Sequence, residues 1–193
     1  MPRRKQQAKV LRLARKWHRT TGALLFVLFL FISISGLLLG WKKHSAGVIL
    51  PRTQRGTTDD LRAWLPLDSL HTLAQGAAAA TLGTAALPDA DRIDVRRSKG
   101  VVKFVFAPGT PTAGPLGVQL DGATGEVLQV QRRYSDVIES IHDGSVVDGY
   151  LGTGGWFKLF YTTVTGAALL LFTITGFWLW YGPKRMRRAA KRA

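Results

Sequence analysis

Two long runs without a charged residue constrain what this chain of 193 residues can fold into. Residues 23–40 and residues 159–181 contain no Asp, Glu, Lys or Arg. At 1.5 Å per residue, a helix over either run is long enough to cross a hydrocarbon core of about 30 Å. The sequence therefore predicts an integral membrane protein with two transmembrane helices.

The net charge of +15 lies almost entirely outside these runs. The first 19 residues carry eight Lys or Arg, the last twelve carry six, and neither segment contains an acid. Residues 42–158 are nearly neutral, with 13 basic and 12 acidic residues. Because basic flanks of a span stay in the cytoplasm, we expect both termini inside, although Lys42 and Lys43 argue mildly for the reverse. We expect the tails to contact anionic lipid head groups rather than nucleic acid.

These patterns predict five segments. They are a basic cytoplasmic lead-in over 1–22, a transmembrane helix over 23–41, an extracytoplasmic domain with linkers over 42–156, a second transmembrane helix over 157–181 and a basic cytoplasmic tail over 182–193. The first apolar run is too long for a signal peptide and is followed by Trp41-Lys42-Lys43, so we expect an uncleaved anchor. The chain has no cysteine, so a redox role would need a bound cofactor.

Periodicity in the central segment predicts a small α+β domain. We expect a helix from Asp68, as N-cap, to about residue 80. Alternating residues then predict two hairpins, formed by strands 92–96 and 101–106 and by strands 116–120 and 126–132. The two hairpins make an antiparallel sheet, and the helix covers one face of it. Residues 134–142 are predicted to be helical, and residues 143–155, with five glycines, to be flexible.

Several short motifs occur in an order that resembles a known family. They are Trp17-His18-Arg19 with Gly22, Ser35-Gly36-Leu37, Leu120-Asp121-Gly122-x-Thr124-Gly125-Glu126-Val127, Ile141-His142-Asp143-Gly144 and the segment Ile174 to Trp180. The helix and hairpins between two spans, with these motifs, resemble the PepSY-associated transmembrane proteins over nearly the whole chain. The implied fold class is membrane α plus α+β, with two transmembrane helices flanking a small extracytoplasmic PepSY-like domain.

The resemblance also implies a function. Larger relatives carry four spans, in effect two copies of this pattern, and some resemble haem-containing reductases that move electrons across the membrane, for example to ferric siderophores. This chain has one copy. The resemblance implies a location in the bacterial inner (cytoplasmic) membrane.

Three of the four histidines lie where the two spans meet the membrane faces. On a helix with 3.6 residues per turn, His18, Gly22, Phe29, Ser33, Gly36, Gly40 and His44 lie within roughly 80° of one another. His18 and His44 are separated by about 39 Å if that helix is continuous. His142 precedes the second span on the outer side, where we expect it to meet His44.

These histidines suggest haem b ligation, because imidazole is a common axial ligand of haem iron and small residues let a flat macrocycle come close. His44 and His142 would supply both axial ligands of an outer site. The inner side offers only His18, so an inner site predicts a homodimer in which His18 meets its symmetry mate.

The same residues allow other interpretations. Small residues such as Gly36 and Gly40 are common at helix contacts in lipid, and His18 also fits an interfacial residue. His44 and His142 could instead bind a transition metal transiently. We expect His71 to be a surface residue of the PepSY-like domain.

The second span carries two further features. We expect the polar face Thr162, Gly166, Thr173 and Gly176 to pack against the first span or against a cofactor. The cluster Phe177, Trp178, Trp180 and Tyr181 is typical of an interfacial belt. No acid pair with catalytic spacing and no Ser-His-Asp motif is recognisable, so no residue is assigned to catalysis.

Two hypotheses follow. The first is a haem b-binding subunit of a transmembrane oxidoreductase that passes electrons to an extracytoplasmic acceptor, such as a ferric chelate, a ferric siderophore or a flavoprotein. The second is a non-redox, membrane-anchored PepSY module that contacts a peptidase or another envelope partner.

Overall fold

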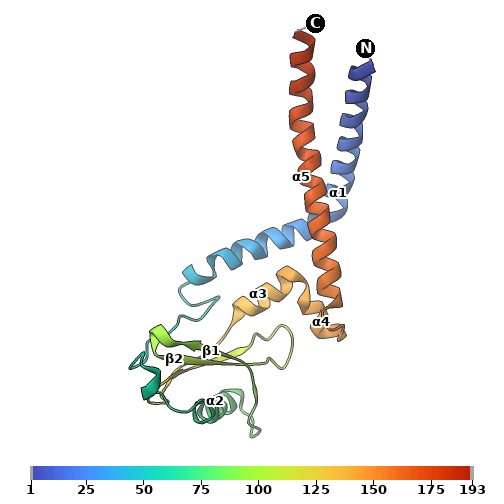
Figure 1. The fold of residues 1–193 in the computed structure, drawn as a ribbon. Coiled ribbons are helices and arrows are strands. Elements are labelled where there is room, and N and C mark those ends of the chain that lie inside the picture. The colour runs from blue at the N-terminus through green and yellow to red at the C-terminus, as the bar shows by residue number, and fades with distance from the viewer. Residues whose placement is uncertain (1, 192–193) are drawn as a thin grey trace. The chain divides into compact units, whose positions relative to one another are not determined.

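The computed structural model describes residues 2–191, with side chains from residue 6 to residue 188. These residues form two compact units (Figure 1). The helical unit comprises residues up to Ile34 and from Thr153 onwards, and the sheet unit comprises Ser35–Gly152. This arrangement of helices and an antiparallel sheet confirms the predicted fold class.

Two long helices supply the apolar segments. Helix α1 runs over Pro2–Trp41 and helix α5 over Trp156–Lys191. Each contains a stretch long and apolar enough to cross a membrane, within Gln6–His44 and Trp156–Arg188. From Pro2 onwards, the basic lead-in is helical and continuous with the first span.

In the helical unit, α1 packs through a stripe in which the spacing alternates between four and three residues. The stripe consists of Ala14, His18, Thr21, Leu25, Leu28 and Ile32, all buried or half-buried. A spacing that averages 3.5 residues keeps one face of a helix against its neighbour. Gly22, beside the stripe, lets Phe172 of α5 come close, because a Cβ on Gly22 would lie 3.0 Å from the Phe172 ring.

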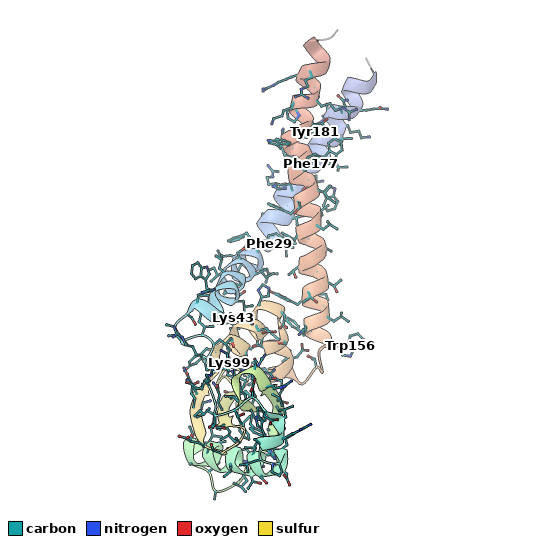
Figure 2. All side chains as sticks on the ribbon, turned by 60° about the vertical axis from the view of Figure 1, so that its left-hand side comes forward. Phe29, Lys43, Lys99, Trp156, Phe177 and Tyr181 are labelled. Carbon is teal, nitrogen blue, oxygen red and sulfur yellow. The ribbon has the colours of Figure 1, made fainter. Side chains whose placement is uncertain are left out.

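Helix α5 has a matching stripe, which is not the predicted one. Its members are Tyr161, Thr165, Ala168, Phe172, Thr175, Leu179 and Gly182. Gly176 of the predicted polar face does lie against His18 of the first span. Thr162, Gly166 and Thr173 are exposed, so for them the prediction of packing against the first span is wrong, and packing against a cofactor stays a prediction. Large residues such as Phe172 fill this interface, whereas the prediction relied on small residues alone. Among the aromatics near the basic end, Phe177 and Tyr181 stack with ring centroids 5.6 Å apart (Figure 2).

The sheet unit contains four antiparallel strands in the order β1-β2-β3-β4. They are β1 (Ala90–Arg96), β2 (Val101–Phe106), β3 (Leu116–Asp121) and β4 (Val127–Arg132). Both predicted hairpins are confirmed. Short 3-10 helices lie at Lys42–His44 (η1), Leu61–Ala63 (η2) and Arg97–Lys99 (η3), the last forming the β1–β2 turn.

Helix α2 (Leu67–Leu82) covers one face of this sheet (Figure 1). The core between helix and sheet contains Leu70, Ala74, Ala78, Val102, Phe104, Phe106, Leu116, Val118 and Leu120. The predicted N-cap is wrong, because Pro66 is the N-cap residue and Asp68 lies inside the first turn. There its carboxylate accepts a hydrogen bond from the amide of Ser69, and its negative charge is favourable near a helix N-terminus.

The opposite face of the sheet is polar and is covered by the segment that follows η1. Lys103 of β2 is only 7% exposed and donates from Nζ to Thr53. Gln119 of β3 donates from Nε2 to the carbonyl of Arg52, and Gln131 of β4 donates to the carbonyl of Gly47. Residues 47–53 are thus held to the sheet by side chains rather than by strand pairing.

Two helices follow the sheet. Helix α3 (Tyr134–Asp143) confirms the prediction for residues 134–142. Helix α4 (Ser145–Leu151) corrects the prediction that residues 143–155 are a flexible segment. The glycines mark its two ends, since Gly144 and Gly152 have positive φ angles of 81° and 65°, a conformation that glycine adopts readily at helix ends.

Candidate functional site

In the helical unit, the His18 ring of α1 is held entirely by α5. The ring is half-buried and stacks on Phe172, with centroids 3.8 Å apart. Its Nδ1 lies 3.2 Å from the carbonyl oxygen of Phe172 and 3.1 Å from Oγ1 of Thr175. Two residues one turn of α5 apart therefore fix both the plane and the rotation of this imidazole.

These partners favour a proton on Nδ1 of His18. A carbonyl oxygen only accepts, so the contact with Phe172 requires a proton on Nδ1. Thr175 can accept as well, because its hydroxyl lies within donating distance of the carbonyls of Leu171 at 2.8 Å and Phe172 at 3.1 Å. In neutral His18 the lone pair is then on Nε2, which makes no hydrogen bond among the described residues and is not buried.

In the sheet unit, His142 of α3 has a similar environment. Its Nδ1 lies 2.9 Å from Oγ of Ser35, near the end of α1. Ser35 is 5% exposed, whereas the His142 ring is half-buried and its Nε2 has no hydrogen-bond partner in the described part of the chain. An ion pair of 3.9 Å between Lys42 of η1, directly after α1, and Glu139 also joins this part of the chain to α3.

A glycine lies beside each of the two rings. A Cβ on Gly176 of α5 would be 3.3 Å from Cε1 of His18, and a Cβ on Gly36 of α1 would be 3.4 Å from Cε1 of His142. Each ring thus packs against bare helix backbone, and the closer approach, at Gly176, leaves no room for a side chain unless the His18 ring shifts.

The other two histidines lie elsewhere. His44 is exposed in η1, and its nearest ring is Trp41 at 6.1 Å. No hydrogen bond or ring contact joins it to His142 within residues 2–191, so their pairing stays a prediction. His71 is not the expected surface residue. Its ring stacks on Phe104 of the core at 5.5 Å, and its Nε2 accepts from the amide of Ala90 at 3.4 Å.

Acidic residues have structural roles here. Asp121 is 2% exposed and accepts hydrogen bonds from Thr57, Ala123 and Thr124. Burial acts to raise the pKa of Asp121, but these hydrogen bonds outweigh it and hold that pKa below its ordinary value. Among the described residues no group of three or more His, Cys, Asp or Glu is arranged to hold a metal ion.

The model of the PepSY-associated TM region family matches residues 1–182. The chain belongs to the PepSY-associated TM region family. It is a membrane protein with a PepSY domain, and α2 with the four strands of the sheet unit has the predicted order for that domain. Comparison with curated proteins gives no significant match.

The structure adds partners that the sequence had not identified. Ser35 was recognised only as part of a motif of PepSY-associated TM region proteins, and Gly36 as part of that motif and of the small-residue stripe of the first span. The structure places both against His142. Phe172 and Thr175 were not recognised as partners of His18, although both lie on the face of α5 that packs against α1. A signal was present, since both positions belong to the stripe with 3.5-residue spacing on α5.

Proposed function

We propose that the chain is a haem b-binding membrane subunit that passes electrons across a bacterial inner membrane to an extracytoplasmic acceptor, such as a ferric chelate or a flavoprotein. The observation that carries the proposal is the hydrogen bond from Nδ1 of His18 to the carbonyl of Phe172. It leaves a lone pair on Nε2, the form in which an imidazole ligates a metal. Bound haem would supply the one-electron chemistry that the side chains of this chain lack.

The partners of the two rings fit this role. A ligating histidine usually donates its other N–H to a carbonyl, carboxylate or water, which fixes the ring and raises its basicity. For His18 that partner is the carbonyl of Phe172, and for His142 the nearest group is the hydroxyl of Ser35. Gly176 and Gly36 let each ring pack closely against helix backbone, and the donor set fits a ligating imidazole.

The energetic cost of leaving Nε2 of His18 without a partner also favours a bound ligand. Polar atoms facing hydrocarbon are costly, and histidines within transmembrane segments are rare and usually functional. His18 lies one turn before the uncharged run that begins at residue 23. A ligand on Nε2 would satisfy an atom that otherwise meets lipid or head groups.

The number of histidines suggests how many chains are needed. Each chain offers one histidine at the His18 site, whereas a haem iron with two histidine ligands needs a second. We propose a homodimer in which His18 meets its symmetry mate. His142 would be completed by His44 or by its own mate.

The orientation follows from the charges. The two basic tails hold 14 of the 15 net positive charges, so both termini are proposed to be cytoplasmic. Residues 42–156, including the PepSY domain, then lie in the periplasm and are available to a redox partner.

The experiment is a histidine series in the full chain, purified from haem-replete cells. Haem per protein is measured for His18→Ala, His142→Ala and His44→Ala, with His71→Ala as the control. We expect His18→Ala and His142→Ala each to lose haem, and His71→Ala to retain it, because its ring packs on Phe104. Full haem content in both of the first two variants would refute the ligand assignment.

One observation favours the second function, a binding module that contacts a peptidase or another envelope partner. Strand β1 is an edge of the sheet, and its Ile93 and Val95 are 40% and 53% exposed. An exposed edge strand with apolar side chains accepts an added strand from a partner. A colourless protein that captures an extended envelope peptide along β1 would support this function instead.

A further inference from the structure

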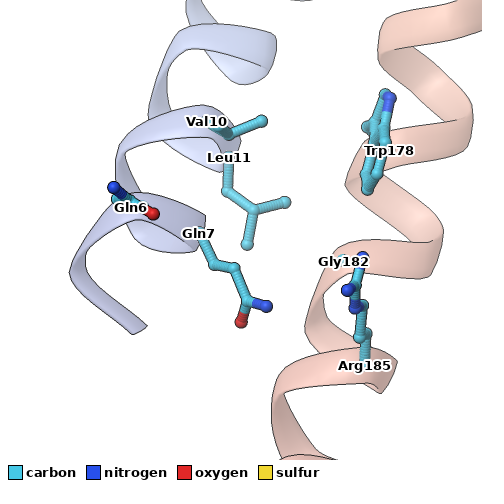
Figure 3. Close-up of a pocket in the computed structure, with 7 residues that line it drawn as sticks. All are labelled: Gln6, Gln7, Val10, Leu11, Trp178, Gly182 and Arg185. Atoms are coloured by element: carbon cyan, nitrogen blue, oxygen red, sulfur yellow. The ribbon is translucent and has the colours of Figure 1, made fainter. Parts of the chain in front are cut away.

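At the basic ends of the two long helices, α1 and α5 enclose a wedge-shaped cavity of about 530 Å³ (Figure 3). It is lined by Gln6, Gln7, Val10 and Leu11 of α1 and by Trp178, Gly182 and Arg185 of α5. Leu11 lies directly against Gly182, where an added Cβ would come within 2.4 Å of the Leu11 side chain. This contact brings the helices together beside the cavity.

The charge of this region favours an external anion. Residues 1–34 and 153–193 contain fifteen Lys or Arg and not one Asp or Glu. Arg185 therefore has no carboxylate in the helical unit with which to pair. The nearby Lys184 is placed over the Trp180 ring, 3.7 Å from its centroid, and also lacks an anionic partner among the described side chains of this unit.

The lining residues are ordered from polar to apolar. On α1 the amides of Gln6 and Gln7 lie nearer the terminus than Val10 and Leu11. On α5 Arg185 lies nearer the terminus than Trp178. The cavity thus offers hydrogen-bond donors and a positive charge at the end toward the aqueous phase, and an apolar surface with an indole ring toward the bilayer, where Trp is favoured at the interface.

We propose that this cavity binds the phosphate head group of an anionic phospholipid. The guanidinium of Arg185 and the amides of Gln6 and Gln7 hold the phosphate, and the acyl chains follow Val10 and Trp178 toward the membrane. Basic pockets between transmembrane helices on the cytoplasmic side are suited to such head groups. The inference is independent of haem, and a bound lipid would join the ends of α1 and α5 two turns from His18.

The test uses the full chain reconstituted in nanodiscs that contain equal phosphatidylglycerol and phosphatidylcholine. After transfer to mild detergent, native mass spectrometry counts the lipids retained. We expect retained phosphatidylglycerol for the wild type, and about tenfold less for Arg185→Gln, a factor typical of losing a charge-assisted contact. Arg188→Gln is the control, since it removes the same charge from an exposed position outside the cavity.

A second variant tests the shape of the site. Val10→Trp fills the apolar part of the cavity without changing any charge, and we expect it to reduce retention as well. Excess inorganic phosphate should not displace the lipid, because the acyl chains contribute to binding. Equal retention in Arg185→Gln and Arg188→Gln would overturn the proposal, and so would a wild type that retains phosphatidylcholine or a quinone in place of phosphatidylglycerol.

Discussion

The Oγ atom of Ser35 in α1 lies 2.9 Å from Nδ1 of His142 in α3, a contact between residues 107 positions apart. It joins the C-terminal part of α1 to the helix that follows the sheet. The first prediction concerns this contact. Ser35→Ala removes the hydroxyl, and we expect the sheet unit to lose about 1 kcal/mol of stability, the net value of one hydrogen bond.

Haem content should fall in Ser35→Ala as well, because the His142 ring loses the group that orients it. Ser33→Ala is the matched control, since Ser33 is exposed two residues away on the same helix. Denaturant midpoints and haem per protein are measured for both variants. Equal values for the two would contradict a role of Ser35 in positioning His142.

The second prediction uses two glycines of α5. A Cβ on Gly176 would lie 3.3 Å from Cε1 of His18, whereas a Cβ on Gly166 would meet nothing within 4 Å. We expect Gly176→Ala to displace the His18 ring and to lower both thermal stability and haem content. Gly166→Ala should be neutral or slightly stabilising, by up to about 1 kcal/mol, because alanine favours the helix. Melting of the two purified variants side by side checks this difference.

The third prediction concerns the polar face of the sheet. Burial, followed by repulsion from Arg96 and Arg133, lowers the pKa of Lys103 to about 8 from its ordinary value of 10.5. Between these pH values the folded chain has released a proton that the unfolded chain keeps, so the stability of the sheet unit rises with pH. The gain in the free energy of unfolding of the sheet unit is at most about 3 kcal/mol.

Lys103→Met should remove this rise while leaving the fold intact, since the methionine side chain has a similar length and no charge. The measurement is the denaturant midpoint of the sheet unit in the full chain at pH 7 and pH 10. The same pH dependence in Lys103→Met and in the wild type would show that another group is responsible.

The fourth prediction concerns the turn between β3 and β4. Asp121 accepts hydrogen bonds from the amides of Thr57, Ala123 and Thr124, and its pKa is lowered. The ionised carboxylate therefore stabilises the fold at neutral pH. This stabilisation is lost in acid, as the pH falls through the folded-state pKa. Asp121→Asn should cost about 2 kcal/mol at pH 7. Glu126→Gln, at an exposed position of the same turn, is expected to have no effect. An acid titration followed by circular dichroism compares them.

Much of the fold could be predicted from the sequence because the signals are local. An uncharged run of about twenty residues has few alternatives to a spanning helix, and strict alternation between turn residues predicts hairpins. The errors also have physical causes. Five glycines between 143 and 155 suggested flexibility, but glycines at helix ends are compatible with the short helix α4 between them.

The candidate site was only partly predictable, because its contacts join residues that are distant in the chain. The sequence indicated that His18 and His142 were candidate ligands. It did not indicate that Ser35 would meet His142, or that Thr175 and the carbonyl of Phe172 would hold His18. The packing face of α5 was mispredicted since small residues were preferred over Phe172, whereas the helices meet through both.

The central claim is that His18 and His142 hold haem, and the absorption spectrum of the purified full chain tests it most directly. The protein is produced in haem-replete cells, and its spectrum is recorded before and after reduction by dithionite. A Soret band that shifts on reduction, with sharpened visible bands of a low-spin b-type haem, is the predicted result. A colourless protein from haem-supplemented cells, with the sheet and helices intact by circular dichroism, would contradict the account.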